Sequence, residues 1–438
     1  MKLNYEGLKA RKEWEKAGVA LPKFDWKQMC EATEKKPVWL HFGAGNIFRG
    51  FIADLQQVLL EQGSETSGII AADTFDYDII DKIYTPYDSM TMMVSLKPDG
   101  NTDKKVIASI AKGLRADSKD ASQWNELKRI FASPSLQMIS YTITEKGYSL
   151  RTMTGELSGL ALKDMEEGPN APIHAMGVTA ALLYERYKAG AAPIAMVSMD
   201  NCSHNGAKLK AGVTEIADAW AEKGLVEKEF IEYLKDEEKV SFPWSMIDKI
   251  TPRPAKEIEV QLEELGIEEM APVVTSKNTY IAPFVNAEIP QYLVIEDRFP
   301  NGRPALEKAG VYMTDRETVN MTERMKVTTC LNPLHTALAV YGCLLGYKSI
   351  ADEMKDKDLV ALIEHIGYDE GMPVVTDPGI IKPMDFIKEV VEERLPNPFI
   401  PDMPQRIATD TSQKVSIRFG ETIKSYMARP DMDASSLT

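Results

Sequence analysis

A short apolar segment that runs straight into a glycine-rich turn constrains the fold of this chain more than any other feature. Residues 37–42 (PVWLHF) lead into a turn at 43–45 (GAG), an amphipathic segment follows at 51–63, and a second apolar segment at 67–73 ends in an aspartate. Glycines at such a turn tolerate unusual φ angles and let the backbone approach a pyrophosphate, and the helix that follows offers unpaired N–H groups. The order strand, glycine turn, helix, strand and acid predicts the start of a dinucleotide-binding domain.

The acid that closes this segment, Asp73, favours NAD over NADP. Its carboxylate could accept hydrogen bonds from the adenosine ribose and would repel a 2′-phosphate. Residues 74–78 contain no arginine or lysine that would hold such a phosphate. The third glycine, Gly50, comes later than in the GxGxxG pattern, so the motif depends on its position between two strands. An ordinary turn beside a solvated aspartate is the alternative interpretation.

Apolar segments continue to alternate with helical patterns through the N-terminal half. Three more strands are predicted at 106–116, 136–144 and 193–200. Short apolar runs separated by helices are typical of a mostly parallel sheet that is covered by helices. The predicted fold class is therefore α/β, with an N-terminal Rossmann-type doubly wound sheet.

The pattern becomes helical from about residue 205, apart from a strand-like segment at 279–300. We place a domain boundary in that segment. The chain is then expected to consist of an N-terminal lead-in at 1–36, a Rossmann-type NAD-binding domain at 37–285, and a mainly α-helical substrate and catalytic domain at 286–438.

Composition and charge exclude several classes of protein. Of 438 residues, 51 are basic and 66 acidic, and the net charge of −15 argues against a nucleic-acid partner. No apolar run approaches the ~20 residues that cross a bilayer, and the charged N-terminus lacks the apolar core of a signal peptide. The cysteines form no CxxC pair and the histidines no HxH or HExxH motif. We therefore expect a cytoplasmic protein with reduced thiols, no membrane partner and no metal site.

Six segments occur in the order in which one enzyme family carries its motifs. They are HFGAGNIFRGF (41–51), SYTITEKGY (140–148), SMDNCSHNG (198–206), FPWSMIDKITP (242–252), MKVTTCLNPLHT (325–336) and RIATDTSQK (406–414). Over roughly residues 37–420 the chain resembles the polyol-specific long-chain dehydrogenases, the mannitol dehydrogenase family. The resemblance implies an N-terminal Rossmann-type domain, a mainly helical C-terminal domain, and zinc-independent oxidation of a secondary alcohol with a nicotinamide cofactor.

The resemblance also implies which residues bind the cofactor, which we expect to be NAD. They lie in the glycine turn, at the end of the second strand and after the third landmark strand: Gly43, Gly45, Asn46, Ile47, Phe48, Arg49, Asp73, Thr144 and Glu145.

One lysine and two asparagines match the catalytic residues of the family. Lys326 falls at the position of the catalytic base, and a buried lysine with cationic neighbours can accept a proton near neutral pH. Asn201 and Asn332 match the two amides that stabilise the alcohol oxygen as charge develops. Glu323 precedes Lys326 by three residues, so on a helix the two share a face and the carboxylate could relay the proton to water.

Further positions match contacts with the substrate: Asp248, His335, Arg406, Lys414 and Lys146. Arg406 and Lys414 are eight residues apart, close to two helical turns, so we predict that they share a helix face. Taken singly, each candidate has a plainer interpretation, such as a solvated lysine, a helix-capping asparagine or a core histidine. The ordered set of motifs favours a dehydrogenase.

The spacing between Lys326 and Asn332 departs from the family pattern. Five residues separate them here, 327–331, where four are usual, and Pro333 follows. We predict that the extra residue is absorbed in a π-bulge or in a helix break, with Asn332 as the cap of a helix that begins at Pro333.

Two features point to the substrate. Lys146 and the segment 397–414 resemble those family members that act on hexonates, whose carboxylate requires a fixed cation. The expected reaction is the NAD-dependent interconversion of D-mannonate and D-fructuronate. The alternatives are mannitol with fructose, and altronate with tagaturonate. A protein that binds NAD without catalysis is a further alternative, with the extra residue before Asn332 as its defect.

Overall fold

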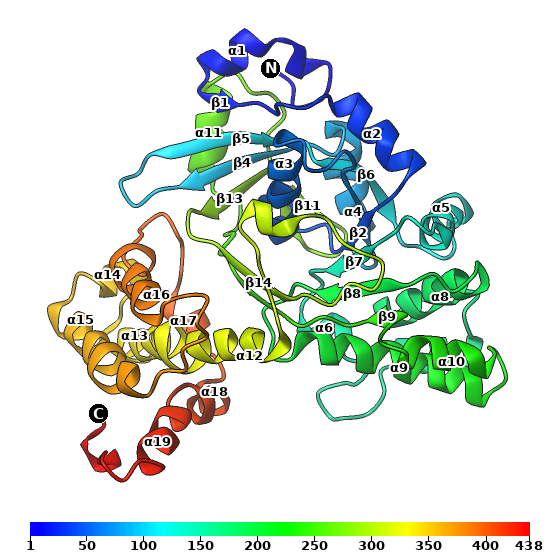
Figure 1. Cartoon of the computed structure of the whole chain (residues 1–438). Helices are drawn as coiled ribbons and strands as arrows, with labels where there is room; N and C mark the ends of the chain where they lie inside the picture. Colours follow the sequence, from blue (N-terminus) through cyan, green and yellow to red (C-terminus); the bar gives the residue numbers. More distant parts are fainter. The chain divides into compact units, whose positions relative to one another are not determined.

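The structure is a computed structural model that describes all residues, 1–438, and it divides into two compact units. The first unit comprises residues 1–95, 103–287 and 291–313, and the second comprises 96–102, 288–290 and 314–438. Figure 1 shows them in sequence colours, with the second unit mainly yellow to red.

The first unit contains the predicted doubly wound sheet. Its strands are β2 (Trp39–Phe42), β3 (Ile69–Asp73), β6 (Ile110–Arg115), β7 (Met138–Tyr141), β8 (Ile194–Ser198) and β9 (Val240–Ser241). Their spatial order is β6-β3-β2-β7-β8-β9, and every neighbouring pair is parallel. Counted along the chain, that order is 3-2-1-4-5-6, the order of a Rossmann fold. The winding reverses between β2 and β7, which is where such sheets bind ligands at the carboxyl ends of their strands.

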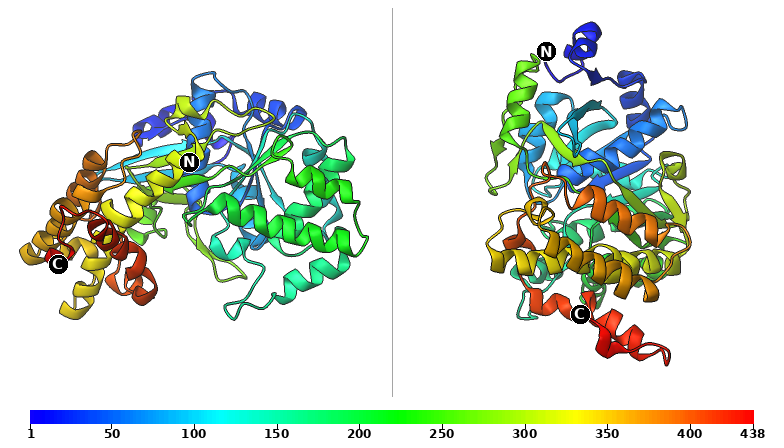
Figure 2. Two further views of the ribbon diagram at one scale, coloured as in Figure 1. Left: turned by 60° about the horizontal axis from the view of Figure 1, so that its bottom comes forward. Right: turned by 90° about the vertical axis from the view of Figure 1, so that its left-hand side faces the viewer.

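Helices cover both faces of this sheet (Figure 2). The helices of the first unit are α1 (Arg11–Lys16), α2 (Trp26–Lys35), α3 (Ala53–Glu61), α4 (Tyr77–Ile79), α5 (Ala121–Ala132), α6 (Glu145–Tyr148), α7 (Gly159–Glu167), α8 (Ala175–Lys188), α9 (Asn205–Glu222), α10 (Lys228–Lys235) and α11 (Lys256–Glu264). Successive residues of a strand point to opposite faces. Leu40 and Ile70 thus pack into one core with α5, α8 and α9, while Trp39 and Ile69 pack into another with α3.

The first unit extends beyond the predicted Rossmann domain at both ends. It continues to Met313, past the predicted boundary at 285, because β14 (Tyr292–Glu296) pairs with β10 (Ser245–Asp248). The predicted lead-in also belongs to it, since β1 (Val19–Ala20) pairs with β5 (Thr102–Ile107). The remaining strands are β4 (Thr91–Leu96), β11 (Val273–Val274), β12 (Tyr280–Ile281), β13 (Phe284–Glu288) and β15 (Tyr312–Thr314).

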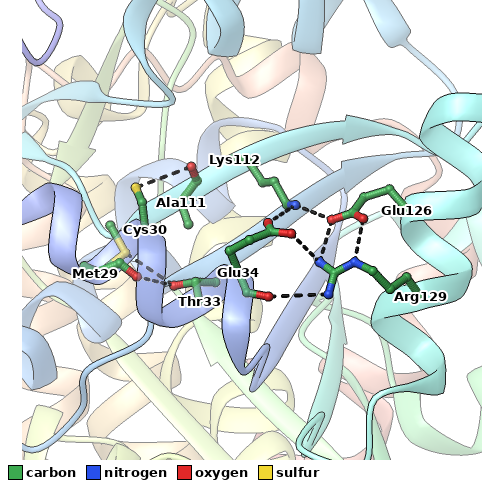
Figure 3. Close-up of polar contacts among 8 residues, drawn as sticks. All are labelled: Met29, Cys30, Thr33, Glu34, Ala111, Lys112, Glu126 and Arg129. Atoms are coloured by element: carbon green, nitrogen blue, oxygen red, sulfur yellow. Dashed lines mark hydrogen bonds and ion pairs between the residues drawn. The ribbon is translucent and has the colours of Figure 1, made fainter.

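A network of ion pairs ties α2 to the sheet and to α5 (Figure 3). Lys112 of β6 contacts Glu34 at 2.5 Å and also contacts Glu126 of α5. Arg129 reaches the same two carboxylates at 2.7 Å each. Cys30, beside this network, donates its thiol to the carbonyl of Ala111, and burial raises the pKa of that thiol to about 12. With so high a pKa, the Cys30 thiol is not a nucleophile at neutral pH.

The second unit is mainly helical, as predicted. Its helices are α12 (Arg316–Met325), α13 (Asn332–Leu345), α14 (Ile350–Glu353), α15 (Lys357–Glu364), α16 (Pro383–Glu389), α17 (Pro404–Ile407), α18 (Thr411–Arg418) and α19 (Gly420–Met427). A buried ion pair joins the short segment 288–290 to this unit, since Arg394 Nη2 lies 2.9 Å from Glu288 Oε1. No helix of residues 1–438 has the length and apolar character that crossing a membrane requires.

Candidate active site

The glycine turn lies at the carboxyl end of β2, beside the point where the winding reverses. Gly43 has a φ of +105°, and a Cβ there would collide with the carbonyl oxygen of Thr142, so only glycine fits. At Gly45 a Cβ would meet no atom within 4 Å. The space beside Gly45 is therefore open, which suits the close approach of a pyrophosphate to the backbone.

The helix after the turn begins at Asn46 and Ile47 and passes through a π-helical turn, Phe48–Ile52, into α3. The side chain of Arg49 is fully buried and donates hydrogen bonds of 2.8 Å to the carbonyl of Ala282 and to Asn46 Oδ1. Burial lowers the pKa of Arg49 to about 10. Phe48 is also buried and stacks on the ring of His41. Both side chains are part of the buried core next to the glycine turn, and Arg49 holds the side chain of Asn46 by its hydrogen bond.

Asp73 connects the end of β3 to the glycine turn. One carboxylate oxygen accepts the N–H of Ala44 at 3.1 Å, and the other accepts the N–H groups of Phe75 and Asp76 at 2.8 Å each. Burial raises the pKa of Asp73, and these N–H contacts oppose that rise. A carboxylate offers about four acceptor positions, so three N–H groups leave room for one more donor, such as a ribose hydroxyl.

The carboxyl end of β7 carries Thr144, Glu145 and Lys146. Thr144 has a φ of +66°, and Asp200 holds this turn by accepting the N–H groups of Ile143 at 2.8 Å and Thr144 at 3.0 Å. Glu145 pairs with Lys208, and Lys146 is exposed on α6. Sequence reasoning missed Asp200, although it stands beside Asn201 at the end of β8, where a polar residue often serves a ligand site.

Asn201 lies exposed in the turn after β8, and a buried asparagine fixes that turn. The side-chain amide of Asn205 donates to the carbonyls of Asp200 and Ser245, both at 3.0 Å, and its oxygen accepts the N–H of Ser245 at 3.0 Å. Ser245 begins β10, whose last residue is the buried Asp248. Asn205 therefore joins the two segments that carry Asn201 and Asp248. Sequence reasoning missed it, because its Asn-Gly sequence resembles an ordinary turn.

Lys326, in the second unit, is only 1% exposed and opens a π-helical turn, Lys326–Cys330, between α12 and α13. A π-bulge is one of the two predicted ways to absorb the extra residue before Asn332, and the structure has a π-helical turn there. Glu323 lies in the last turn of α12, and its carbonyl accepts the N–H of Lys326.

The predicted capping role of Asn332 is wrong. The helix α13 begins at Asn332 itself, Pro333 is its second residue, and Leu331 stands at the cap position without a side-chain hydrogen bond. The physical reason is that the π-helical turn leads almost directly into α13: Leu331 donates to the carbonyl of Lys326 and His335 donates to that of Leu331. Few N–H groups are left for a cap to satisfy, and the Asn332 amide is not used for one.

The remaining predicted substrate contacts are in the second unit. His335 Nε2 lies 2.6 Å from Asp402 Oδ2, and Arg406 Nη2 lies 2.7 Å from Asp402 Oδ1. Lys414 Nζ donates to the carbonyls of Ile407, at 3.1 Å, and Thr409. Burial, together with the charge of Arg418, lowers the pKa of Lys414.

The prediction that Arg406 and Lys414 share one helix face is wrong. Arg406 is on α17 and Lys414 on α18, and Asp410 between them has a φ of +58°, which ends any continuous helix. The lysine instead caps the carbonyl end of α17, where a cation is favourable.

No group of three or more histidine, cysteine, aspartate or glutamate side chains in residues 1–438 is arranged to hold a metal ion. The second unit also contains a cavity of about 290 Å³ that includes Thr336 and Arg418 in its lining. None of the predicted site residues lines that cavity.

Two family models match the chain and together cover most of it. The model described as the mannitol dehydrogenase Rossmann domain matches residues 38–308, and the model described as the mannitol dehydrogenase C-terminal domain matches residues 318–438. A D-mannonate oxidoreductase from Thermotoga maritima is 57% identical over 100% of this chain and 81% of its own length.

Two solved structures share this fold. A D-sorbitol dehydrogenase in substrate-free form has a TM-score of 0.80 at 25% identity, covering 95% of this chain and 80% of its own. The Pseudomonas fluorescens mannitol 2-dehydrogenase in a ternary complex with NAD and D-mannitol has a TM-score of 0.76 at 28% identity, covering 98% and 80%.

Proposed function

The chain belongs to the mannitol dehydrogenase family, and from this premise we propose that it is an NAD-dependent oxidoreductase that interconverts D-mannonate and D-fructuronate. The observation that carries the proposal is the 57% identity, over the whole chain, with a D-mannonate oxidoreductase. The alternatives to this substrate pair are mannitol with fructose, and altronate with tagaturonate.

The first unit fits NAD. Gly43 permits the tight turn, the open space at Gly45 admits a pyrophosphate, and Asn46 and Ile47 begin the helix whose first N–H groups favour an anion. Thr144 and Glu145, at the carboxyl end of β7, complete the proposed contacts. When bound, NAD supplies the acceptor for the hydride.

Asp73 is proposed to enforce the choice of NAD. We expect Asp73→Ala to raise the ratio of kcat/KM with NADP to kcat/KM with NAD by about tenfold or more, because a carboxylate that repels the 2′-phosphate is removed. The same change removes the acceptor for three backbone N–H groups, so both values should fall and only their ratio is diagnostic. A wild-type protein that used NADP as well as NAD would contradict the assignment.

The proposed chemistry needs a base and two hydrogen-bond donors. Lys326 accepts the proton of the substrate hydroxyl, and the amides of Asn201 and Asn332 donate to the oxygen as negative charge develops on it. Glu323, one helical turn from Lys326, passes the proton toward solvent. No metal ion takes part in this scheme.

Cations and polar side chains are proposed to select the sugar acid. Arg406, Lys414 and Lys146 are the candidates for its carboxylate, and Asp248 and His335 for its hydroxyl groups. Of the cations, the Arg406 side chain is 66% exposed, and a guanidinium has five N–H donors, so its contact with Asp402 leaves donors for a substrate. Lys414 already donates to two carbonyls. Arg406 is therefore the favoured partner of the carboxylate.

Formation of NADH from NAD, followed with a panel of hexonates and polyols, tests the proposed class of reaction. The oxidoreductase proposal predicts turnover with at least one sugar acid. Binding of NAD without turnover of any compound would favour the alternative of a catalytically silent NAD-binding protein.

The proposed setting is the cytoplasm, with a sugar acid or polyol as the partner and no nucleic acid. None of the four cysteines, Cys30, Cys202, Cys330 and Cys343, forms a disulfide, which fits a reducing compartment. The net charge of −15 disfavours binding to phosphate backbones.

A further inference from the structure

Asp402 connects two of the residues to which the proposed function gives contacts with the substrate. One of its carboxylate oxygens lies 2.6 Å from His335 Nε2 on α13, and the other lies 2.7 Å from Arg406 Nη2 on α17. Asp402 lies in the segment 397–414 but is not among the predicted site residues, and neither neighbour on its own would indicate its role.

The backbone of Asp402 is fixed on both sides. Its N–H donates to the carbonyl of Ile400 at 2.8 Å, and its carbonyl accepts the N–H of Ile350, at the start of α14, at 2.9 Å. The side chain is 12% exposed. The carboxylate is thus held in place independently of the two side chains that it contacts.

The neighbours of Asp402 lower its pKa. Burial alone would raise its pKa, but the contacts with His335 and Arg406 outweigh burial, and the pKa of Asp402 is lowered. Glu353, the remaining acid that faces Asp402, is fully buried, and burial together with the charge of Asp402 raises its pKa to about 8. At neutral pH the pair therefore carries one negative charge, on Asp402.

The contact between Asp402 and His335 is a close polar contact and not a hydrogen bond, since Nε2 lies 2.6 Å from Oδ2 but is buried without a hydrogen-bond partner. Asp402 therefore restrains the position of the His335 ring and does not determine which ring nitrogen carries the proton.

We propose that Asp402 is a positioning residue of the substrate site, which restrains the His335 ring and holds Arg406 toward the substrate carboxylate. This inference rests on the proposed function, which supplies the substrate contacts of both residues. The Arg406 side chain is exposed, so its contact with Asp402 contributes little to stability, and the effect of Asp402 is expected on substrate binding.

The test uses the full chain and steady-state kinetics with D-mannonate and NAD. Asp402→Asn should raise KM for D-mannonate about tenfold and change kcat by less than about threefold, because a charged contact is lost from residues that bind the substrate. In a His335→Ala background the same substitution should raise KM by a clearly smaller factor, since one of its two targets is already absent. Asp352→Asn, an exposed acid on α14, is the matched control and should leave both constants unchanged.

Two results would overturn the positioning role while the proposed function stands: an unchanged KM in Asp402→Asn, or an equal rise in KM with and without the His335 side chain. Absence of any turnover by the wild-type protein would overturn the proposed function instead. Asp402→Glu tests the proposal even if Asp402→Asn does not fold, because it keeps the charge but moves the two carboxylate oxygens. Its KM for D-mannonate should rise while kcat changes by less than about threefold, and an unchanged KM would contradict the proposal.

Discussion

Replacing Lys326 with alanine is expected to lower kcat for D-mannonate by at least ~100-fold and to leave the affinity for NAD unchanged. The side chain is 1% exposed, so solvent cannot readily take over its role as the base. The residues proposed to bind NAD are in the first unit, whereas Lys326 is in the second. The measurements are kcat from NADH formation and the Kd of NAD from quenching of protein fluorescence.

Lys424→Ala is the matched control for this substitution, because Lys424 is an exposed lysine of the same unit that pairs only with Glu421. Its kcat should equal that of the wild type. A Lys326→Ala protein that keeps activity within a few-fold of the wild type would exclude Lys326 as the base. Equal losses of kcat and NAD affinity would instead indicate a folding defect.

Replacing Arg406 with methionine is expected to raise KM for D-mannonate by ~10–100-fold, which corresponds to the ~1.5–3 kcal/mol of a hydrogen bond to a charged group. A carboxylate that enters a partly dry site loses hydration, and only a paired cation restores that free energy. Methionine retains much of the length of the side chain and removes its charge. The measurement is KM for D-mannonate and, in parallel, for mannitol.

Mannitol is the internal control for Arg406→Met, because it has no carboxylate, and any residual activity with it should hardly change. Arg429→Met controls for loss of a surface arginine in the same unit, since Arg429 donates to the carbonyl of Pro373. If Arg406→Met weakened both substrates equally, the guanidinium would not be the partner of the carboxylate. Lys146 and Lys414 would then be the remaining candidates.

The features that the sequence predicted correctly are local ones. The segments around β2, β3, β7 and β8 are short, apolar and separated by helical patterns, and in the structure they are neighbouring parallel strands. Such runs are typical of strands buried on both faces. The π-helical turn at Lys326–Cys330 could be predicted because one extra residue had to be accommodated within a helical segment.

The features that the sequence did not predict depend on contacts between distant segments. The four-stranded sheet β1-β5-β4-β13 joins strands from widely separated parts of the chain, so no local sequence pattern predicts it. Asn205 and Asp200 look like turn residues until β8 and β10 are seen together. The boundary at Met313 likewise follows from the pairing of β10 with β14 and not from composition.

Asp402 and Asn332 illustrate the same limit within the candidate site. Asp402 gains its role only when α13 and α17 bring His335 and Arg406 to its two oxygens. Asn332 before a proline is typical of a helix cap, but in the structure α13 already begins at Asn332 and Leu331 stands at the cap position. Sequence spacing thus identified the residue and misassigned its local structure.

The ratio of kcat/KM for D-mannonate to kcat/KM for mannitol, measured on the wild-type protein with NAD, tests the central claim most directly. Both compounds present secondary alcohols, and only D-mannonate carries a carboxylate for a cation such as Arg406. We predict a ratio of at least ~10 in favour of D-mannonate, matching one charged hydrogen bond. A ratio of one or less would contradict the proposed substrate and make mannitol with fructose the better assignment.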